Sequence, residues 1–214
     1  MSFIDENLLQ YIHDVQPLFE GKLGQIQREA LENKVPIIPP ETARLLAVLI
    51  SSSKAKNILE IGCAVGFSAS LMATYMCPDG KITTIDRYPV MIEKAKATFE
   101  YMDISDKVRL LEGDAADILP TLTETYDFIF LDAAKGQYIY FLPECLRLLK
   151  SGGILLADNI LQKGTVAGSI DEIPRRQRTI HRRLRDFLHT ISHTETLQSS
   201  IIPIGDGISI SYKL

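Results

Sequence analysis

Short apolar runs rich in β-branched residues alternate with amphipathic stretches along most of the chain. The runs predict strands at residues 57–61, 81–85, 107–111, 127–131 and 153–157, and the stretches predict helices near 67–76, 89–101, 115–121 and 137–149. Strands separated by helices of this length form right-handed βαβ units. The pattern therefore predicts an α/β fold in which helices cover both faces of a mainly parallel sheet.

The start of the chain departs from this alternation. Residues 5–33 carry apolar positions at helical spacing, and the segment 36–40, with three prolines, interrupts any helix before it. A further helix is expected over about 41–51. We expect a single domain over residues 1–214, in which a helical N-terminal part (1–52) precedes an α/β core (53–214).

The end of the chain departs from it as well. A helix near 174–190 is followed by two apolar runs at about 194–202 and 207–213, joined through Gly205-Asp206-Gly207. Two strands joined by so short a turn should be antiparallel.

The composition is that of an ordinary globular protein, with 46% apolar and 23% charged residues. The acidic start MSFIDENLLQ lacks the pattern of a signal peptide, and apolar runs such as Leu45–Ile50 are too short to cross a bilayer. We therefore expect a cytoplasmic protein without a membrane partner. Cys63, Cys77 and Cys145 form no CxxC pair, which indicates neither a disulfide framework nor a zinc site.

A glycine-containing loop follows the first predicted strand. It reads Glu60-Ile61-Gly62-Cys63-Ala64-Val65-Gly66-Phe67-Ser68 and opens a helix. Glycines let a ligand approach the backbone, and the N–H groups at a helix N-terminus favour an anion. Ala64 stands where a dinucleotide fingerprint has its second glycine, so the carboxylate of an amino acid fits the loop better than a pyrophosphate.

Acidic residues end the next two strands. Asp86 lies 24 residues after Gly62 and could accept hydrogen bonds from a ribose diol, although alone it is more typical of a strand-end turn. Gly113 and Asp114 end the third strand, where an adenine would lie in such a crevice. Asp114 could equally cap the helix that follows.

Asp132, Asp158 and Asn159 are the most informative residues. They end two predicted strands, and if those strands are neighbours their side chains gather at one edge of the sheet. Two carboxylates and an amide oxygen suit Mg²⁺, Mn²⁺ or Ca²⁺. Each residue alone would more often be a cap or a turn residue, but close carboxylates repel unless a cation lies between them. Lys135 could be that cation, could act on a substrate proton, or could be an exposed lysine.

Three motifs carry a resemblance to a known family. LEIGCAVGFSA, FIFLDAAKGQY and LLADNILQKGTVA resemble motifs of the cation-dependent O-methyltransferases, which include catechol and caffeoyl-CoA methyltransferases. The resemblance implies a class I, Rossmann-like fold with seven strands, the last antiparallel, and commonly a homodimer. It implies that Asp132, Asp158 and Asn159 bind the metal. We expect Lys135 and Asp132 to be the catalytic residues. The resemblance places S-adenosylmethionine against Ser68, Asp86, Gly113, Asp114 and Asp132, with Ile38 over the cofactor. From the glycine loop we add Glu60, Gly62 and Gly66 to the residues expected to bind it.

Within this family the chain looks most similar to bacterial tRNA 5-hydroxyuridine methyltransferases. The likeness rests on VPII, DAAKGQY, DNILQKGTVA, an arginine-rich stretch after Pro174 and the ending IIPIGDGISIS. The chain has Ala133 where animal catechol enzymes carry a histidine, and it has no tryptophan. The resemblance favours 5-hydroxyuridine in the anticodon region of a tRNA as the substrate, and a small catechol-like or caffeoyl-CoA-like vicinal diol is the alternative.

The arginine-rich stretch is a basic segment on an acidic chain. The net charge is −4, yet residues 171–193 contain six arginines and three acids. Arg175, Arg178, Arg182 and Arg185 fall on one helical face, with Arg176 and Arg183 close by. A run of charged residues is usually a solvated helix face. Like charges at i, i+4 repel one another, however, and binding to a phosphate backbone would offset this repulsion. We expect these six residues to bind RNA.

The predicted chemistry is metal-assisted methyl transfer. A divalent ion at the trio would bind two neighbouring oxygens of the substrate and lower the pKa of the hydroxyl, and Lys135 could assist the deprotonation. A nonenzymatic RNA-binding protein is disfavoured by the intact trio. An NAD-dependent oxidoreductase is disfavoured by Ala64 and by the lack of a Tyr-x-x-x-Lys pair.

Overall fold

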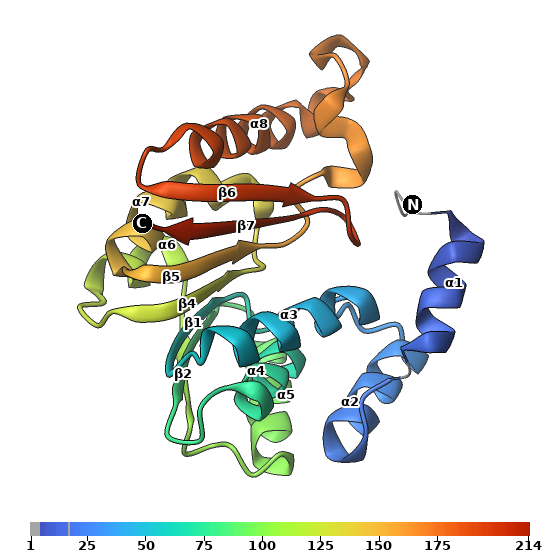
Figure 1. Cartoon of the computed structure of the whole chain (residues 1–214), viewed down its shortest axis with the longest axis vertical. Helices are drawn as coiled ribbons and strands as arrows, with labels where there is room; N and C mark the ends of the chain where they lie inside the picture. The colour runs from blue at the N-terminus through green and yellow to red at the C-terminus, as the bar shows by residue number, and fades with distance from the viewer. Residues whose placement is uncertain (1–4, 17) are drawn as a thin grey trace.

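The computed structural model describes residues 5–16 and 18–214, and these residues form one seven-stranded sheet in the order β3-β2-β1-β4-β5-β7-β6 (Figure 1). The strands are β1 Asn57–Ile61, β2 Lys81–Asp86, β3 Val108–Glu112, β4 Tyr126–Leu131, β5 Leu149–Ala157, β6 Leu197–Ile202 and β7 Ile208–Lys213. The first five are parallel, and β7 is antiparallel to both β5 and β6. The predicted fold class is confirmed.

Helices pack on both faces of the sheet. The helices are α1 Glu6–Val15, α2 Gly21–Glu32, α3 Pro40–Ser53, α4 Phe67–Tyr75, α5 Pro89–Tyr101, α6 Ala115–Ile118, α7 Tyr138–Leu148 and α8 Arg178–His193, and of these α1 belongs to neither layer. In one core cluster, the helices α2, α3, α4 and α5 pack against one face of the sheet. In a second cluster, α6, α7 and α8 pack against the other face. Apolar side chains of the helices therefore pack against both faces of the sheet. This explains why the central strands are almost continuously apolar, since neither of their faces is exposed to water.

Two predicted helices have different bounds in the structure. The helix expected over 115–121 is divided into α6 and a short 3₁₀ turn, η1 Leu119–Thr121. Pro120 explains the change, because it has no N–H to continue the α-helical hydrogen bonds. The C-terminal helix begins at Arg178 rather than near 174 and is preceded by a 3₁₀ turn, η5 Arg175–Gln177.

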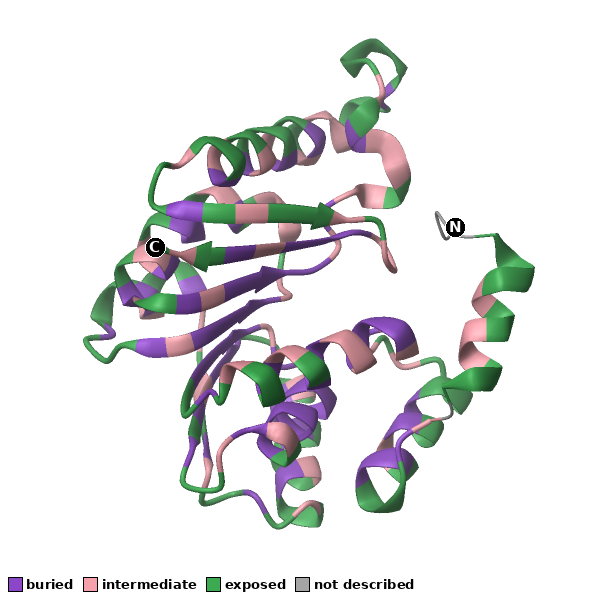
Figure 2. Cartoon of the chain, in the orientation of Figure 1, coloured by how far each residue is buried: buried purple, intermediate pink, exposed green. Residues whose placement is uncertain are grey.

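Burial is greatest in the central strands, while α1 lies apart from the sheet (Figures 1 and 2). None of the residues of α1 is buried, and Leu8 and Tyr11 are 52% and 65% exposed. His13 pairs with Glu41 of α3 across 2.9 Å. The acidic start of the chain, interpreted above against a signal peptide, includes residues 1–4, which lie outside the described residues. Within the described ranges, no helix has the length and apolarity needed to cross a membrane.

The parallel topology sets where a site can form. β1, β2, β3, β4 and β5 all end at the same edge of the sheet, and the strand order reverses beside β1. Ligands of open α/β sheets bind outside the carboxyl ends of the strands at such a point. The predicted site residues that follow strand ends lie at this edge.

Candidate active site

The loop after β1 requires glycine at two positions. Gly62 has φ +103°, and a Cβ there would lie 2.1 Å from the carbonyl oxygen of Asp132. Gly66 has φ +81° and stands immediately before α4, where a Cβ would lie 2.8 Å from the Phe99 ring. L-residues with side chains rarely adopt these conformations, and neither position has room for one. The loop therefore packs directly against the end of β4.

Asp86 holds this loop in place. Its Oδ2 accepts the backbone N–H groups of Cys63 and Ala64 at 3.1 and 2.9 Å, and its Oδ1 accepts the N–H of Tyr88 at 2.9 Å. A carboxylate has about four acceptor positions, so Asp86 can also accept from a ligand. The expected contact with a ribose is compatible with this geometry, and the loop-holding role is one that the sequence did not indicate.

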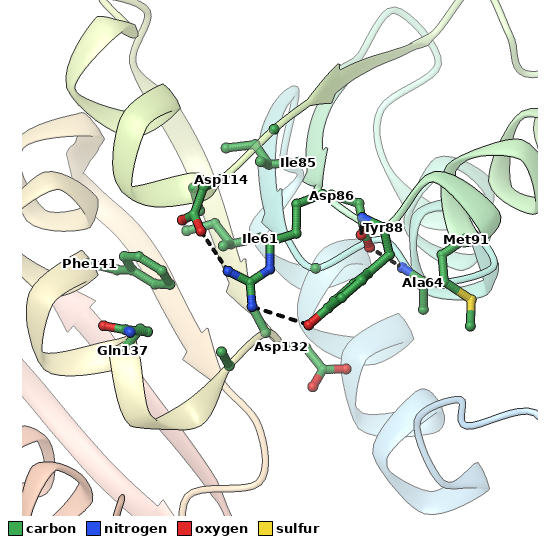
Figure 3. Close-up of a pocket in the computed structure, with 16 residues that line it drawn as sticks. Ile61, Ala64, Ile85, Asp86, Tyr88, Met91, Asp114, Asp132, Gln137 and Phe141 are labelled. Carbon is green, nitrogen blue, oxygen red and sulfur yellow. Dashed lines mark hydrogen bonds and ion pairs between the residues drawn. The ribbon is translucent and has the colours of Figure 1, made fainter. Parts of the chain in front are cut away.

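Two adjacent cavities open beside the loop. The larger, about 330 Å³, is lined by Gly62, Asp86, Gly113, Asp114 and Asp132, with apolar walls from Ile61, Ile85, Met91 and Phe141 (Figure 3). The smaller, about 40 Å³, is lined by Ile38, Gly62, Ser68 and Asp132 among others. The structure thus brings seven of the nine residues predicted to bind the cofactor to these two cavities. Glu60 and Gly66 line neither of them.

Arg87 reaches across the larger cavity. Its guanidinium donates to Asp114 Oδ2 at 2.6 Å and to the Tyr88 hydroxyl at 3.1 Å (Figure 3). Asp114 Oδ1 accepts the N–H of Ala116 at the start of α6. This backbone hydrogen bond, followed by the arginine, lowers the pKa of Asp114. Asp114 is therefore a helix cap as well as a cavity residue, and the sequence had left these as alternatives.

Glu60 is fully buried behind the loop. Thr84 Oγ1 donates to its Oε2 at 2.5 Å, while Oε1 has no hydrogen-bond partner among the described residues. Burial raises the pKa of Glu60 to about 7, because desolvation disfavours the charged form. Glu60 therefore lines neither cavity and is bound instead to Thr84 of the neighbouring strand β2.

The structure brings Asp132, Asp158 and Asn159 together. Asp132 follows β4, Asp158 and Asn159 follow β5, and these neighbouring strands pair in register at Leu131 and Ala157. Asn159 Nδ2 lies 3.5 Å from Asp132 Oδ1, and the backbone N–H of Asn159 donates to Asp158 Oδ1 at 2.6 Å. Asn159 has φ +60°, a left-handed conformation that asparagine tolerates better than most residues.

Among Asp132, Asp158 and Asn159, one carboxylate oxygen has no hydrogen bond and the two carboxylates repel each other. Asp158 Oδ2 is buried and accepts no hydrogen bond from residues 5–16 or 18–214. Burial raises the pKa of Asp132, and the charge of Glu60 adds to this; burial and then the charge of Asp132 raise the pKa of Asp158. No cluster of three or more His, Cys, Asp or Glu side chains suited to a metal occurs in the described ranges. The donors here are two carboxylates and an amide.

Lys135 lies beside the trio and is held by a residue that the sequence analysis did not select. Its Nζ is 3.1 Å from Oδ2 of Asp206, which lies in the turn between β6 and β7. The turn had been recognised as Gly205-Asp206-Gly207, but not as part of the site. Tyr138 was also missed: its hydroxyl donates to the carbonyl oxygen of Asp158 at 3.1 Å.

The arginines divide into two groups. Three bind backbone carbonyl oxygens: Arg178 that of Ile173, Arg183 that of Gly136, and Arg185 that of Val166, at 2.9, 3.1 and 3.3 Å. The other three, Arg175, Arg176 and Arg182, are exposed and form no hydrogen bond or ion pair with the part of the chain that the structure describes. The six therefore do not form one free basic face, and half of them fix α8 to its neighbours.

The sheet order, the glycine loop and the cavity at the strand ends define the class I adenosylmethionine-dependent methyltransferase fold. A model of the O-methyltransferase family matches residues 20–214, and the chain belongs to this family.

Relatives cover most of the chain. The caffeoyl-CoA O-methyltransferase of Populus kitakamiensis is 30% identical, over 98% of this chain and 94% of that protein. The catechol O-methyltransferase of Niastella koreensis is 31% identical, over 76% of each chain. Among solved structures, an O-methyltransferase from Bacillus cereus in complex with SAH shares the fold, with a TM-score of 0.84, 24% identity and 97% of each chain covered.

Proposed function

We propose that this O-methyltransferase uses S-adenosylmethionine and a divalent cation to methylate one oxygen of a small catechol-like or caffeoyl-CoA-like vicinal diol. The observation that carries the proposal is the meeting of Asp132, Asp158 and Asn159 at the sheet edge, with a buried Asp158 oxygen left without a partner. The names of the relatives from Populus and Niastella support the diol as substrate class.

The cavities support the cofactor. Adenosylmethionine has an adenine, a ribose and an amino-acid end, and the larger cavity offers apolar walls and the Asp86 carboxylate for the first two. The smaller cavity, with Ser68 at the start of α4, offers helix N–H groups to a carboxylate. SAH, bound in the Bacillus cereus relative, is adenosylmethionine without its methyl group.

A divalent cation fits the trio. Oxygen donors are what Mg²⁺, Mn²⁺ and Ca²⁺ prefer, and a cation would offset the repulsion between the carboxylates of Asp132 and Asp158 and satisfy the buried Asp158 Oδ2. Asp132, Asp158 and Asn159 would hold it. Such an ion would lower the pKa of a neighbouring substrate hydroxyl and so favour the nucleophilic form of its oxygen at neutral pH.

The residues around the trio supply charge and position. The ammonium of Lys135 stands where it can stabilise negative charge on a substrate oxygen or take part in its proton transfer. Asp132 borders both cavities, and an ion that it held would bring the acceptor oxygen next to the methyl donor. In-line attack on the sulfonium methyl then depends mainly on this positioning.

The first experiment measures methyl transfer from S-adenosylmethionine to catechol and to caffeoyl-CoA. We expect turnover with Mg²⁺, loss with EDTA and recovery when Mg²⁺ is added in excess. The variant Asp158→Ala should lose at least ~100-fold in kcat, because a missing ligand leaves the remaining carboxylate unable to hold the ion. The variant Asp79→Ala, at the opposite edge of the sheet, is the matched control. Turnover that EDTA does not change would contradict the metal role.

A second candidate substrate is 5-hydroxyuridine in a tRNA. It is favoured by the exposed Arg175, Arg176 and Arg182, which have no partner in the described structure. Arg182 lies on α8, and Arg175 and Arg176 lie in the turn η5 just before it. α8 contacts the segments on either side of the trio, because Arg183 binds Gly136 beside Lys135 and Arg185 binds Val166. A phosphate backbone could use such a surface, and a ring hydroxyl next to a carbonyl offers the same two oxygens as a diol.

The arginine contacts decide which variant tests this candidate. Replacing Arg175, Arg176 and Arg182 with Ala should weaken tRNA binding and make the salt dependence of log K shallower by about 2 to 3 units, since each lost phosphate contact removes roughly 0.9. The variant should fold normally. Replacing Arg178 and Arg185 instead would disturb backbone contacts as well. Equal binding before and after the triple substitution would leave the small diol as the substrate. The homodimer implied by the resemblance stays a prediction, for light scattering to test.

A further inference from the structure

We propose that Asp206 is a positioning residue for methyl transfer: from the tip of the β6–β7 hairpin, it orients Lys135 and anchors the segment η3 Gln162–Ala167 beside the trio. The catalytic half of this inference rests on the proposed function. The anchoring half does not.

Asp206 joins three parts of the chain that are far apart in the sequence. Its Oδ2 accepts from Lys135 Nζ at 3.1 Å, its Oδ1 accepts the backbone N–H of Lys163, and its own carbonyl oxygen accepts the N–H of Leu161 at 2.9 Å. Its side chain is 20% exposed. Every oxygen of the residue is therefore engaged in holding another segment at the edge of the site.

The segment that Asp206 anchors is strained. Gln162 and Lys163 have φ of +46° and +55°, and Asn159, three residues earlier, has φ +60°. Such conformations are unfavourable for residues other than glycine and persist only where surrounding contacts over-determine them. The hydrogen bond from Lys163 to Asp206 is one of these contacts, and it falls on a residue that carries the strain.

The tip of the β6–β7 hairpin packs closely against Ile160 and Leu161. A Cβ at Gly207, which has φ +87°, would lie 2.2 Å from Leu161 Cγ, and the N–H of Ile160 donates to the Gly207 carbonyl oxygen at 3.1 Å. The carboxylate of Asp206 is thus fixed by its own backbone. A long, flexible lysine paired with a positioned carboxylate is restricted to few of its rotamers, which preorganises its ammonium group.

The first test follows hydrogen exchange of residues 162–167 without substrate. Asp206→Ala removes the acceptor, so the Lys163 amide should exchange at least ~10-fold faster than in the wild type. Asp206→Asn keeps an acceptor oxygen and should change this rate much less. Asp79→Ala, which breaks the exposed pair with Lys56 at the opposite edge, is the control. Unchanged exchange in Asp206→Ala would overturn the anchoring role.

The second test is a double-mutant cycle on turnover with a diol that the wild type methylates. Asp206→Asn should lower kcat about 10- to 100-fold, the cost of a small misplacement, and leave the KM for adenosylmethionine unchanged. Lys135→Met should mask it, so that the double variant equals Lys135→Met alone. Asp206→Glu, which keeps the charge, should recover part of the rate. Additive losses, or a raised KM for the cofactor, would overturn the role through Lys135.

The two tests separate the possible failures. If the wild type methylates no diol, the proposed function fails, while hydrogen exchange still decides whether Asp206 anchors η3. If the wild type is active and the cycle is additive, the proposed function stands and the positioning role is wrong.

Discussion

Glu60 shows how a single buried group makes stability depend on pH. An unfolded chain releases the proton of a glutamate near pH 4.5, whereas the folded protein holds this one until about pH 7. Between these values the folded state binds more protons than the unfolded state, so the free energy of unfolding falls as the pH rises. This loss of stability is complete above about pH 7, and below pH 4.5 there is none.

The variant Glu60→Gln should therefore be more stable than the wild type at pH 8 and about equally stable at pH 4.5. The amide stays neutral and can still accept from Thr84, so the gain at high pH should be on the order of 3 kcal/mol. Urea unfolding at both pH values, without cofactor, measures it. Glu32→Gln, at an exposed position of α2, serves as the control. A difference between Glu60→Gln and wild type that does not change with pH would contradict the burial effect.

At the residue scale, the sequence predicted the residues that follow strand ends and missed those that come from elsewhere. Asp132, Asp158 and Asn159 meet because neighbouring parallel strands end together, and periodicity is enough to indicate that. Asp206 reaches the same edge only because β7 inserts between β5 and β6. That is a long-range pairing which no local pattern encodes, and Tyr138 depends in the same way on how α7 packs.

At the element scale, α8 combines two different faces. Leu184, Phe187 and Ile191 are buried, and the Phe187 ring meets Tyr138 edge to face with centroids 5.6 Å apart. The opposite side carries the exposed Arg182. The strand and helix periods predicted most elements to within a few residues, but the left-handed residues of η3 could not be predicted, because tertiary contacts impose them against the local preference.

Replacing one residue on each face of α8 separates packing from charge. Phe187→Ala should lower the free energy of unfolding by about 3 to 5 kcal/mol, because it leaves a cavity beside Tyr138. Arg182→Ala should change it by no more than about 0.5 kcal/mol, since its side chain is exposed. Urea titrations of the two variants give both values. If Arg182→Ala proved as destabilising as Phe187→Ala, the arginine would be a structural residue and not a candidate for binding RNA.

At the scale of the whole molecule, the buried carboxylate of Asp158 beside the half-buried carboxylate of Asp132 lowers the stability of the metal-free protein. A cation that binds the folded state but not the unfolded one raises stability by mass action, about 2.7 kcal/mol at 100 times its Kd. For a chain of this size the melting temperature should rise by roughly 5 to 10 °C. Thermal melts in EDTA and in saturating Mg²⁺ measure the shift.

Variants at the two edges of the sheet provide the comparison for these melts. Asp158→Asn should abolish the rise in melting temperature, because it removes a ligand charge, while Asp79→Asn should keep it. A shift of equal size in Asp158→Asn would mean that Mg²⁺ acts elsewhere on the protein.

The contact between Gly62 and the carbonyl oxygen of Asp132 affects how genetic data on this enzyme should be interpreted. Any side chain at position 62 would clash with the backbone of Asp132, a proposed metal ligand. A substitution in the loop after β1 would then present as a magnesium phenotype. Loss of the response to magnesium in a random mutant is therefore no proof that a ligand was hit, and assignment requires the sequence change as well as the phenotype.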